Sequence, residues 1–443
     1  MTRIQVHKEL ESLVFLLYNI GVEINKKKEL LKRWEIIGKE NTMNVIDILD
    51  ERGYIEQVTD KENLKKLTEK ERFPFYIGID PTADSLHVGH FVSLMVASHM
   101  QKAGFTPIIL MGGGTANIGD PSGKTDMRKM LTKEEINHNV ECIKKQVSKF
   151  VSFEGENAAI IVNNADWLSD KKYIDFMREI GTKFTVSRML AADCYKNRLE
   201  TGLTFFEMGY MLMQSYDFLH LYNKYGCKLE IGGNDQWSNI IGGVELVRKF
   251  NHDDAFGLTF KLLTTKEGKK MGKTEKGALW LDATKTSPYD FYQYWRNIDD
   301  GDVKKVMCML TFLSMDEINE LTNVEGEEIN KAKKVAAYEI TKLVHGEEEA
   351  KKAEDATLSL FGGNQNSDNI PKVKIEPNTT IVSALVSASF ATSKSQAKQL
   401  VIQGGVSLND EKITDINFVI DDSLLSQEPI LRKGKKGYCK LVR

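Results

Sequence analysis

The sequence lacks the features that mark membrane, secreted and zinc-dependent proteins. Its richest apolar run, residues 13–22, is roughly half of the ~20 residues that a membrane-spanning helix needs. Glu9 and Glu11 precede that run and no small-residue cleavage site follows it, which argues against a signal peptide. The five cysteines form no CxxC pair, which argues against a zinc site and a disulfide framework. We therefore expect a protein without a membrane contact, in a reducing cytoplasmic setting.

The charge is nearly balanced over the whole chain but not at its end. The formal net charge is −3 for 443 residues, a length that allows two or three domains. Residues 432–443 contain six lysines and arginines and no acidic residue. This basic end fits contact with a polyanion, and a solvated, frayed chain end is the alternative.

Short apolar segments alternate with helical ones from about residue 73. The sequence predicts strands at residues 75–79, 106–111, 158–162 and 228–232, separated by segments long enough for helices. This alternation is typical of a parallel sheet with crossover helices, and hence of the α/β class. Ligands of such sheets bind beyond the carboxyl ends of the strands, where glycines and polar residues occur in this chain.

The composition changes again in the second half. Residues 288–361 are expected to be helical, and their aromatic cluster at 289–295 is expected to lie in a core. The polar, glycine- and asparagine-rich stretch that follows predicts a linker over residues 362–378. Residues 379–443 predict a small α/β unit with a basic-faced helix at 393–402 and a strand at 406–409.

Two motifs about 180 residues apart indicate the chemistry. His87 and His90 are spaced to share one face at the start of a helix, where free N–H groups attract anions. Lys270, Lys273 and Thr274 lie in a glycine-containing, charged loop. Together they suit a nucleoside triphosphate whose α-phosphate is attacked, because that transition state gains negative charge. Alone, the histidines could be surface or capping residues, and the lysines an ordinary solvated loop.

A third segment, residues 112–124, carries glycines after a predicted strand but lacks the spacing of a Walker loop. Asp120 is a candidate partner for an ammonium group, and Lys124 and Arg128 are candidates for phosphate contacts. Asp120 could instead cap a turn, and Lys124 could be solvated.

A fourth segment places Tyr210, Gln214 and Asp217 at helical positions i, i+4 and i+7. Polar groups on one face of an otherwise apolar helix need partners, which favours a pocket wall over a core. After the last predicted strand, Gly233 permits close approach of a nucleoside and Asp235 can accept from ribose hydroxyls, although Gly-Gly-Asn-Asp is also an ordinary turn.

Taken together, these segments resemble the bacterial-type tyrosyl-tRNA synthetases, a family of class I aminoacyl-tRNA synthetases, from about residue 43 to the C-terminus. The resemblance implies a Rossmann-like catalytic domain at 43–287, a helical anticodon-side domain at 288–361 and an S4-like RNA-binding domain at 379–443. It leaves residues 1–42 as a helical appendage of unknown role. The implied reaction activates tyrosine with ATP and transfers it to tRNA(Tyr).

The resemblance also implies a role for each site residue. Tyr76 and Asp217 would bind the phenol hydroxyl of tyrosine. Its ammonium and carboxylate would contact Asp120, Tyr210, Gln214 and Gln236. The adenosine moiety would contact Gly78, Asp80, Gly233, Asp235 and Lys273. The pyrophosphate would be stabilised by Thr82, His87, His90, Lys124, Arg128, Lys270, Lys273 and Thr274. Mg²⁺ would accompany ATP without a protein metal site.

The family pattern is not matched everywhere. Val88 replaces an isoleucine of the histidine motif, Gly272 and Thr274 replace serines of the lysine motif, and Glu230 stands where we expect glutamine. The resemblance further implies a homodimer, for which residues 184–203 are our predicted interface. Three alternatives remain open: a tryptophanyl-tRNA synthetase, an inactive RNA-binding protein on a synthetase scaffold, and a simple nucleotidyltransferase.

Overall fold

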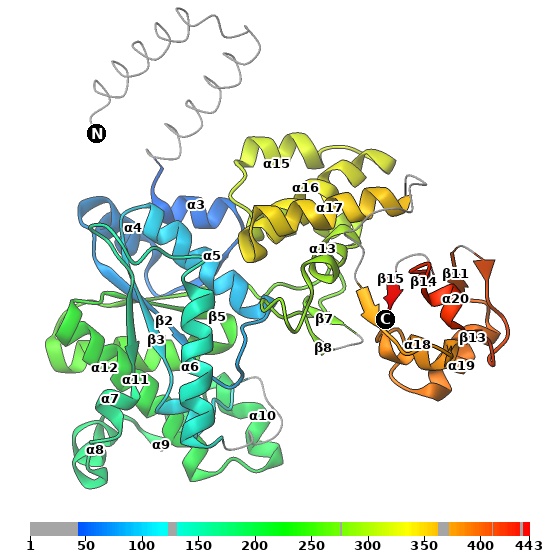
Figure 1. Cartoon of the computed structure of the whole chain (residues 1–443). Helices are drawn as coiled ribbons and strands as arrows, with labels where there is room; N and C mark the ends of the chain where they lie inside the picture. The colour runs from blue at the N-terminus through cyan, green and yellow to red at the C-terminus, as the bar shows by residue number, and fades with distance from the viewer. Residues whose placement is uncertain (1–42, 123–130, 275–276, 362–371, 410, 435–436) are drawn as a thin grey trace, which may run out of the picture. The chain divides into compact units, whose positions relative to one another are not determined.

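The computed structural model describes residues 43–122, 131–274, 277–361, 372–409, 411–434 and 437–443 (Figure 1). The appendage predicted at residues 1–42, the side chains of Lys124 and Arg128, and residues 362–371 of the predicted linker lie outside this range. Contacts divide the chain into two units. One contains the described residues up to Lys285 together with Asp299–Ala332, and the other contains Thr286–Ile298 and Lys333–Arg443. The five-part domain division stays a prediction.

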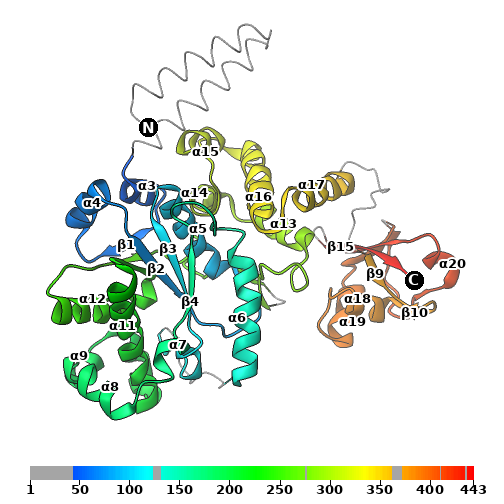
Figure 2. The ribbon, with the colours of Figure 1, turned by 60° about the vertical axis from the view of Figure 1, so that its left-hand side comes forward.

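The first unit is built around a six-stranded sheet of order β1-β6-β5-β2-β3-β4 (Figure 2). All neighbours are parallel except the edge pair β1 and β6. The strands are β1 (Ile55–Val58), β2 (Pro74–Ile79), β3 (Thr106–Met111), β4 (Ile160–Asn163), β5 (Leu229–Gly233) and β6 (Phe256–Phe260). The predicted α/β class and the four predicted strands, β2 to β5, are confirmed. The sequence reading missed β1, which is polar and half-exposed, and β6, a short buried run interrupted by Gly257.

Helices cover both faces of this sheet (Figures 1 and 2). After β2 the chain forms the neighbouring strand β3, toward one edge of the sheet. After β5 it forms the neighbouring strand β6, toward the opposite edge. The helices that make these two connections are α5 (Val88–Lys102) and α12 (Trp237–Asn251). Because parallel crossovers are right-handed, they lie on opposite faces of the sheet. The direction in which new strands are added thus reverses between β2 and β5. Sheets of this kind bind ligands at such a reversal, beyond the carboxyl ends of the strands.

The helices of this unit are α3 (Val45–Glu51), α4 (Lys61–Lys70), α5 (Val88–Lys102), α6 (Lys133–Val147), α7 (Ala165–Leu168), α8 (Tyr173–Glu179), α9 (Val186–Leu190), α10 (Asp193–Thr201), α11 (Phe205–Tyr225), α12 (Trp237–Asn251), α14 (Val303–Leu310) and α15 (Met315–Thr322). Side-chain hydrogen bonds cap the N-terminal ends of six helices in the described part of this unit, α3, α4, α5, α6, α11 and α15.

Helix α11 is fixed most firmly, and it carries three predicted site residues. Thr204 and Glu207 form a reciprocal capping box at its start, and Gly226 ends it in the left-handed conformation, with φ +67°. The buried guanidinium of Arg198 donates to both carboxylate oxygens of Glu207, each at 3.0 Å. These contacts hold the first turn of α11 in place, one turn before Tyr210.

The second unit contains helices and the C-terminal α/β segment. Helix α16 (Ile329–His345) leads into it, and α13 (Pro288–Arg296) packs against α17 (Glu347–Phe361). Tyr289, Phe291, Tyr292 and Trp295 are buried, which confirms the prediction of a core rather than a ligand site. The predicted helical character of residues 288–361 is also confirmed.

The C-terminal segment has its own sheet, of order β12-β11-β14-β15-β9, and a separate β10-β13 pair. Its elements are β9 (Lys372–Lys374), β10 (Thr379–Thr380), α18 (Ile381–Ser387), α19 (Lys394–Ile402), β11 (Val406–Leu408), β12 (Glu411–Lys412), β13 (Val419–Ile420), α20 (Asp422–Leu425), β14 (Ile430–Lys433) and β15 (Gly437–Val442). Helix α19 and strand β11 confirm the two predicted elements. Residues 437–442 form a strand paired on both sides, so a frayed chain end is the wrong interpretation there.

No helix within the described ranges is both long enough and apolar enough to cross a membrane.

Candidate active site

A cavity of about 430 Å³ opens at the carboxyl ends of β2 and β5. Segments far apart in the sequence line it, and fourteen of the predicted site residues are among them: Tyr76, Gly78, Asp80, Thr82, His87, His90, Asp120, Tyr210, Gln214, Asp217, Gly233, Asp235, Gln236 and Lys270. Lys273 and Thr274 form the short strand β7, which pairs with β8 (Gly277–Ala278), but their side chains lie outside the described part of the structure. The motifs that the sequence analysis identified separately therefore line one cavity in the structure.

The histidine and lysine motifs are joined by backbone hydrogen bonds. The N–H of Val88 donates to Leu279 O at 3.2 Å, and the N–H of Leu279 donates to Gly272 O at 2.7 Å. Leu281 N donates to Leu86 O at 2.8 Å, so the chain segment after the lysine loop runs along the start of α5. This arrangement brings Lys270 and both histidines to the rim of one cavity.

His87 is the N-cap of α5. Its Nδ1 accepts from the N–H of Gly89 at 3.0 Å, while His90 Nδ1 accepts from the N–H of His87 at 3.3 Å. The two imidazole rings lie 4.2 Å apart between centroids. Both histidines also line the cavity, so the capping alternative and the ligand-binding prediction are compatible.

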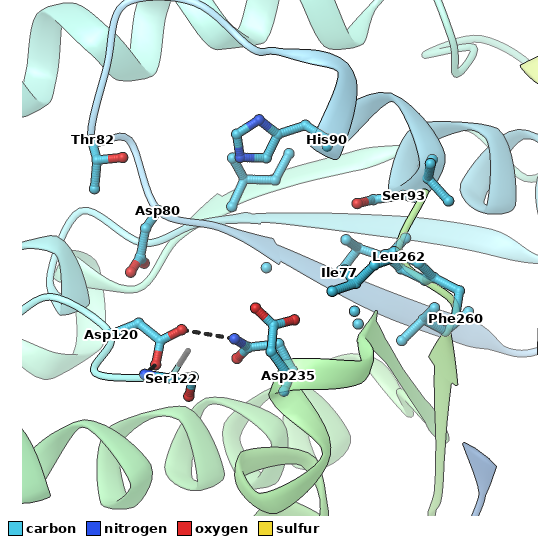
Figure 3. A pocket seen from close by; sticks show the side chains of 18 of the residues that line it. Ile77, Asp80, Thr82, His90, Ser93, Asp120, Ser122, Asp235, Phe260 and Leu262 are labelled. Carbon is cyan, nitrogen blue, oxygen red and sulfur yellow. Dashed lines mark hydrogen bonds between the residues drawn. The ribbon is translucent and has the colours of Figure 1, made fainter. Parts of the chain in front are cut away.

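Asp80, Asp120 and Asp235 come from three separate segments of the chain and line the same cavity (Figure 3). Asp80 accepts from the Tyr210 hydroxyl at 2.9 Å and from Thr115 Oγ1 at 2.8 Å. Asp120 accepts from Gln236 Nε2 at 2.7 Å and from the N–H of Ser122 at 2.9 Å. These partners hold the first two carboxylates in fixed orientations.

Asp217 lies at the inner end, with 1 % of its surface exposed. It accepts from Asn164 Nδ2 at 2.9 Å and from Trp167 Nε1 at 2.7 Å. Burial raises the pKa of Asp217 to about 8, although these two donors act in the opposite direction. The hydroxyl of Tyr76, another lining group, is buried without a hydrogen-bond partner among the described residues. Burial, and then the carboxylates of Glu230 and Asp217, raise the pKa of Tyr76 well above its usual value.

Glu230 is a further buried carboxylate of this inner end. Its Oε1 accepts from Gln214 Nε2 at 2.9 Å. Burial raises the pKa of Glu230 to about 7, and the nearby Tyr76 hydroxyl and Gln214 amide oppose that rise. The inner end is thus rich in carboxylates, while His87, His90 and Lys270 lie at the rim. A ligand with phosphates toward the rim and an ammonium group beside Asp120 matches this distribution of polar groups.

The sequence reading did not assign Thr115, Asn164, Trp167 or Asn239, which orient site residues. Asn239 Nδ2 donates to Gln236 Oε1 at 3.2 Å, and Asn164 also donates to Thr115 Oγ1 at 3.1 Å. The polar end of the strand before Asn164 was a signal for that residue, but nothing in the local sequence marked Trp167. Among the described residues, no group of three or more histidine, cysteine, aspartate or glutamate side chains is arranged to hold a metal ion.

Comparison with known families covers nearly the whole described chain. Residues 68–362 match the family model described as tRNA synthetases class I (W and Y). Residues 364–441 match the model of the tyrosine–tRNA ligase SYY-like C-terminal domain.

Individual relatives give the same result. The chain is 57 % identical over 404 residues to tyrosine–tRNA ligase 1 of Clostridium acetobutylicum, covering 90 % of this chain and 99 % of the relative. It is 55 % identical over 403 residues to the tyrosine–tRNA ligase of Clostridium kluyveri, with the same coverage. Among solved structures, a C-terminally truncated mitochondrial tyrosyl-tRNA synthetase of Aspergillus nidulans superposes with a TM-score of 0.66 at 28 % identity, covering 76 % of this chain and 99 % of that one.

Proposed function

The chain belongs to the tyrosine–tRNA ligases among the class I tRNA synthetases, and we propose that its cavity binds tyrosine at the inner end and ATP toward the rim. Its reaction is the ATP-dependent attachment of tyrosine to tRNA(Tyr). The observation that carries the site assignment is the single cavity that unites the histidine motif, the lysine motif and the buried pair Tyr76 and Asp217.

Tyr76 and Asp217 recognise the phenol of the substrate. Asp217 is an acceptor held by Asn164 and Trp167. The Tyr76 hydroxyl lies near the Glu230 carboxylate but makes no hydrogen bond of normal geometry to the described residues. A phenol hydroxyl satisfies both groups. Phenylalanine would leave the buried Tyr76 hydroxyl unpaired and would offer Asp217 no third contact, which is costly. The same argument disfavours tryptophan, whose indole N–H can donate but cannot accept.

The amino and carboxylate groups of tyrosine bind farther out. Asp120, Tyr210 and Gln214 surround the ammonium, and Gln236 lies near the carboxylate. The hydrogen bonds of Asp120 with Gln236 and Ser122 support this arrangement, because they fix the carboxylate before substrate enters.

ATP binds beside this group. Gly78, Asp80, Gly233 and Asp235 contact the adenosine moiety, with Gly233 allowing close approach. The residues that stabilise the pyrophosphate are Thr82, His87, His90, Lys124, Arg128, Lys270, Lys273 and Thr274.

The tyrosine carboxylate attacks the α-phosphate in line and pyrophosphate leaves. A terminal ribose hydroxyl of tRNA then attacks the carbonyl of the adenylate. No side chain acts as a covalent nucleophile, because positioning and charge stabilisation suffice.

Mg²⁺ accompanies the phosphates of ATP. The cation keeps several waters and prefers substrate phosphates to an all-protein cage. The donor set agrees with this, since Asp80 and Asp120 already accept hydrogen bonds from neighbouring protein groups. Mg²⁺ would neutralise phosphate charge, in addition to the imidazoles and lysines of the chain.

The segment at residues 379–443 binds tRNA, the stretch at 43–287 is the catalytic domain, and the helices of 288–361 form an anticodon-side domain. The match to a tyrosine–tRNA ligase C-terminal domain supports the first assignment, as does the basic stretch from Arg432. All five cysteines are free, which agrees with a cytoplasmic location.

The protein forms a homodimer through an apolar face of the first unit. Each of the helices α8 to α11 exposes large apolar side chains, namely Tyr173, Ile174, Val186, Leu199, Phe205 and Phe206, which we take together as this apolar face. Exposed apolar side chains of this size favour a covering surface, and a second copy supplies a self-complementary one. The face includes part of the predicted interface at residues 184–203.

ATP–pyrophosphate exchange with single amino acids tests the function. Tyrosine should drive exchange and tryptophan and phenylalanine should not; exchange with another amino acid alone would overturn the assignment. Replacing His87 and His90 with alanine should abolish exchange but preserve tRNA binding. An inactive RNA-binding protein would show no exchange before the substitution either.

A further inference from the structure

Glu230 lies against two groups of the tyrosine site. It is the register partner of Tyr76 on the neighbouring parallel strand, so both side chains project from the same face of the sheet. Both line the cavity. Glu230 has only 1 % of its surface exposed, and nothing in the proposed reaction uses its carboxylate.

The carboxylate is held from behind by α12. A Cβ built on Gly243 would lie 3.0 Å from Glu230 Oε2 and 3.0 Å from Phe218 Cβ. The absence of a side chain at Gly243 thus makes room for the carboxylate and leaves little space for it to turn away. Glu230 Oε2 is packed against Gly243 and makes no hydrogen bond to the described residues, so Oε1 is the acceptor that the carboxylate presents to its neighbours.

That acceptor determines how the amide of Gln214 is oriented. Gln214 Nε2 donates to Glu230 Oε1 at 2.9 Å, and Gln214 Oε1 is buried without a hydrogen-bond partner among the described residues. Above pH 7, where the Glu230 carboxylate is ionised, it only accepts, so the NH₂ group of Gln214 must face Glu230 and the carbonyl oxygen must face away from it. A glutamine at position 230 could donate or accept, and would allow both orientations of Gln214.

We propose that Glu230 is a positioning residue for the amino acid substrate, which locks the Gln214 carbonyl oxygen toward the substrate ammonium. This inference rests on the proposed binding of tyrosine in this cavity. The unpartnered Gln214 oxygen then gains a charged donor when substrate binds, whereas a flipped amide would turn its NH₂ group toward the ammonium and lose that hydrogen bond.

The substitution Glu230→Gln tests the lock, with the KM for tyrosine and for ATP measured in pyrophosphate exchange. We expect the KM for tyrosine to rise about tenfold, the size of one hydrogen bond to a charged group. We expect kcat and the KM for ATP to stay within about twofold, because neither depends on the ammonium contact. An unchanged KM for tyrosine overturns the proposal.

A substrate analogue separates positioning from general damage to the pocket. 3-(4-Hydroxyphenyl)propionate keeps the phenol and the carboxylate but lacks the ammonium. Its inhibition constant should be the same in wild type and E230Q, within about twofold. If E230Q raises the inhibition constant of the analogue by the same factor as the KM for tyrosine, Glu230 only maintains the shape of the cavity.

Two further variants complete the test. In a Gln214→Ala background, adding E230Q should change the KM for tyrosine by less than about twofold, because the mediating amide is gone. Glu230→Asp keeps the charge but shortens the reach, so it should resemble E230Q; a wild-type KM in E230D would mean that charge alone matters. If tyrosine drives no exchange in the wild-type protein, the proposed function fails, which is a different result from any of these.

Discussion

Gly272 of the lysine motif lies directly on Val88 of the histidine motif. A Cβ at Gly272 would be 2.7 Å from Val88 Cβ, and Gly272 has φ +81°. Both residues depart from the family pattern, in which isoleucine and serine are expected. The contact places the lysine loop on the first turn of α5, beside both histidines.

Gly272→Ala should therefore displace the loop. Alanine adds left-handed strain of about 1 kcal/mol as well as a steric overlap that Val88, itself buried, cannot relieve. We expect the exchange rate to fall about tenfold or more, through kcat and the KM for ATP, with the KM for tyrosine preserved.

The matched control is Gly268→Ala in the same loop. Gly268 also has φ +81°, but nothing lies within 4 Å of its built Cβ. This variant has the strain without the overlap, so it should remain near wild type. If the exchange rate falls equally in both variants, backbone strain alone, and not contact with Val88, explains the loss.

His87 has a capping role that can be separated from its proposed role in catalysis. Loss of the cap in His87→Ala should lower the free energy of unfolding by about 1 kcal/mol, together with a loss of activity. His87→Asn keeps a good N-cap and should unfold like wild type, yet lose exchange activity. Thermal unfolding and exchange rates check this. An H87N enzyme with normal activity would restrict His87 to capping.

Trp167 should affect the binding of tyrosine, because it donates a hydrogen bond to Asp217. Trp167→Phe removes the N–H that donates to Asp217 Oδ1 but keeps a ring to stack on His220, which lies 4.3 Å away between centroids. We expect the KM for tyrosine to rise about tenfold, because Asp217 loses one of the two donors that orient it. The KM for ATP should not change. A parallel rise in both constants would contradict a specific role in the tyrosine site.

Glu230 should make the stability of the protein depend on pH. Its folded pKa of about 7 lies above its ordinary value of 4.5, so the folded state binds the extra proton between these two values. The stabilising contribution is complete below pH 4.5 and is lost as the pH rises through 7. Relative to wild type, E230Q should therefore gain at least about 1 kcal/mol of unfolding free energy between pH 5 and pH 8.

Urea unfolding at the two pH values measures this difference. Glu141→Gln is the control, since Lys144 lowers the pKa of this exposed carboxylate and no gain with rising pH is expected. If the difference in unfolding free energy between E230Q and wild type is the same at pH 5 and pH 8, the raised pKa of Glu230 is contradicted.

Phe205 should be needed for dimerisation. Its side chain is 69 % exposed at the start of α11, where aspartate favours the helix. Phe205→Asp should thus preserve the fold but shift the protein to monomers, as measured by sedimentation. Phe153→Asp, at a 38 % exposed position outside the apolar face, should remain dimeric. A dimeric F205D protein would place the interface elsewhere.

The sequence reading succeeded where one local pattern has one physical meaning. Buried parallel strands appear as short apolar runs, so β2 to β5 were found within two residues. Helical spacing put Tyr210, Gln214 and Asp217 on one face, and all three line the cavity. It failed for β1, where alternate polar residues at an edge strand resemble a loop.

The sequence by itself determined the class of fold, the strands that hold the site and the motifs that line it, because periodicity and motif spacing are local properties. Only the tertiary structure decided which groups those motifs meet. Trp167 and Asn164 reach Asp217 from fifty residues away, Gln214 finds Glu230 on another element, and Gly272 rests on Val88. A hydrogen bond and a steric contact depend on distances of a few ångströms between chain segments, which only the packing of the sheet and its helices sets.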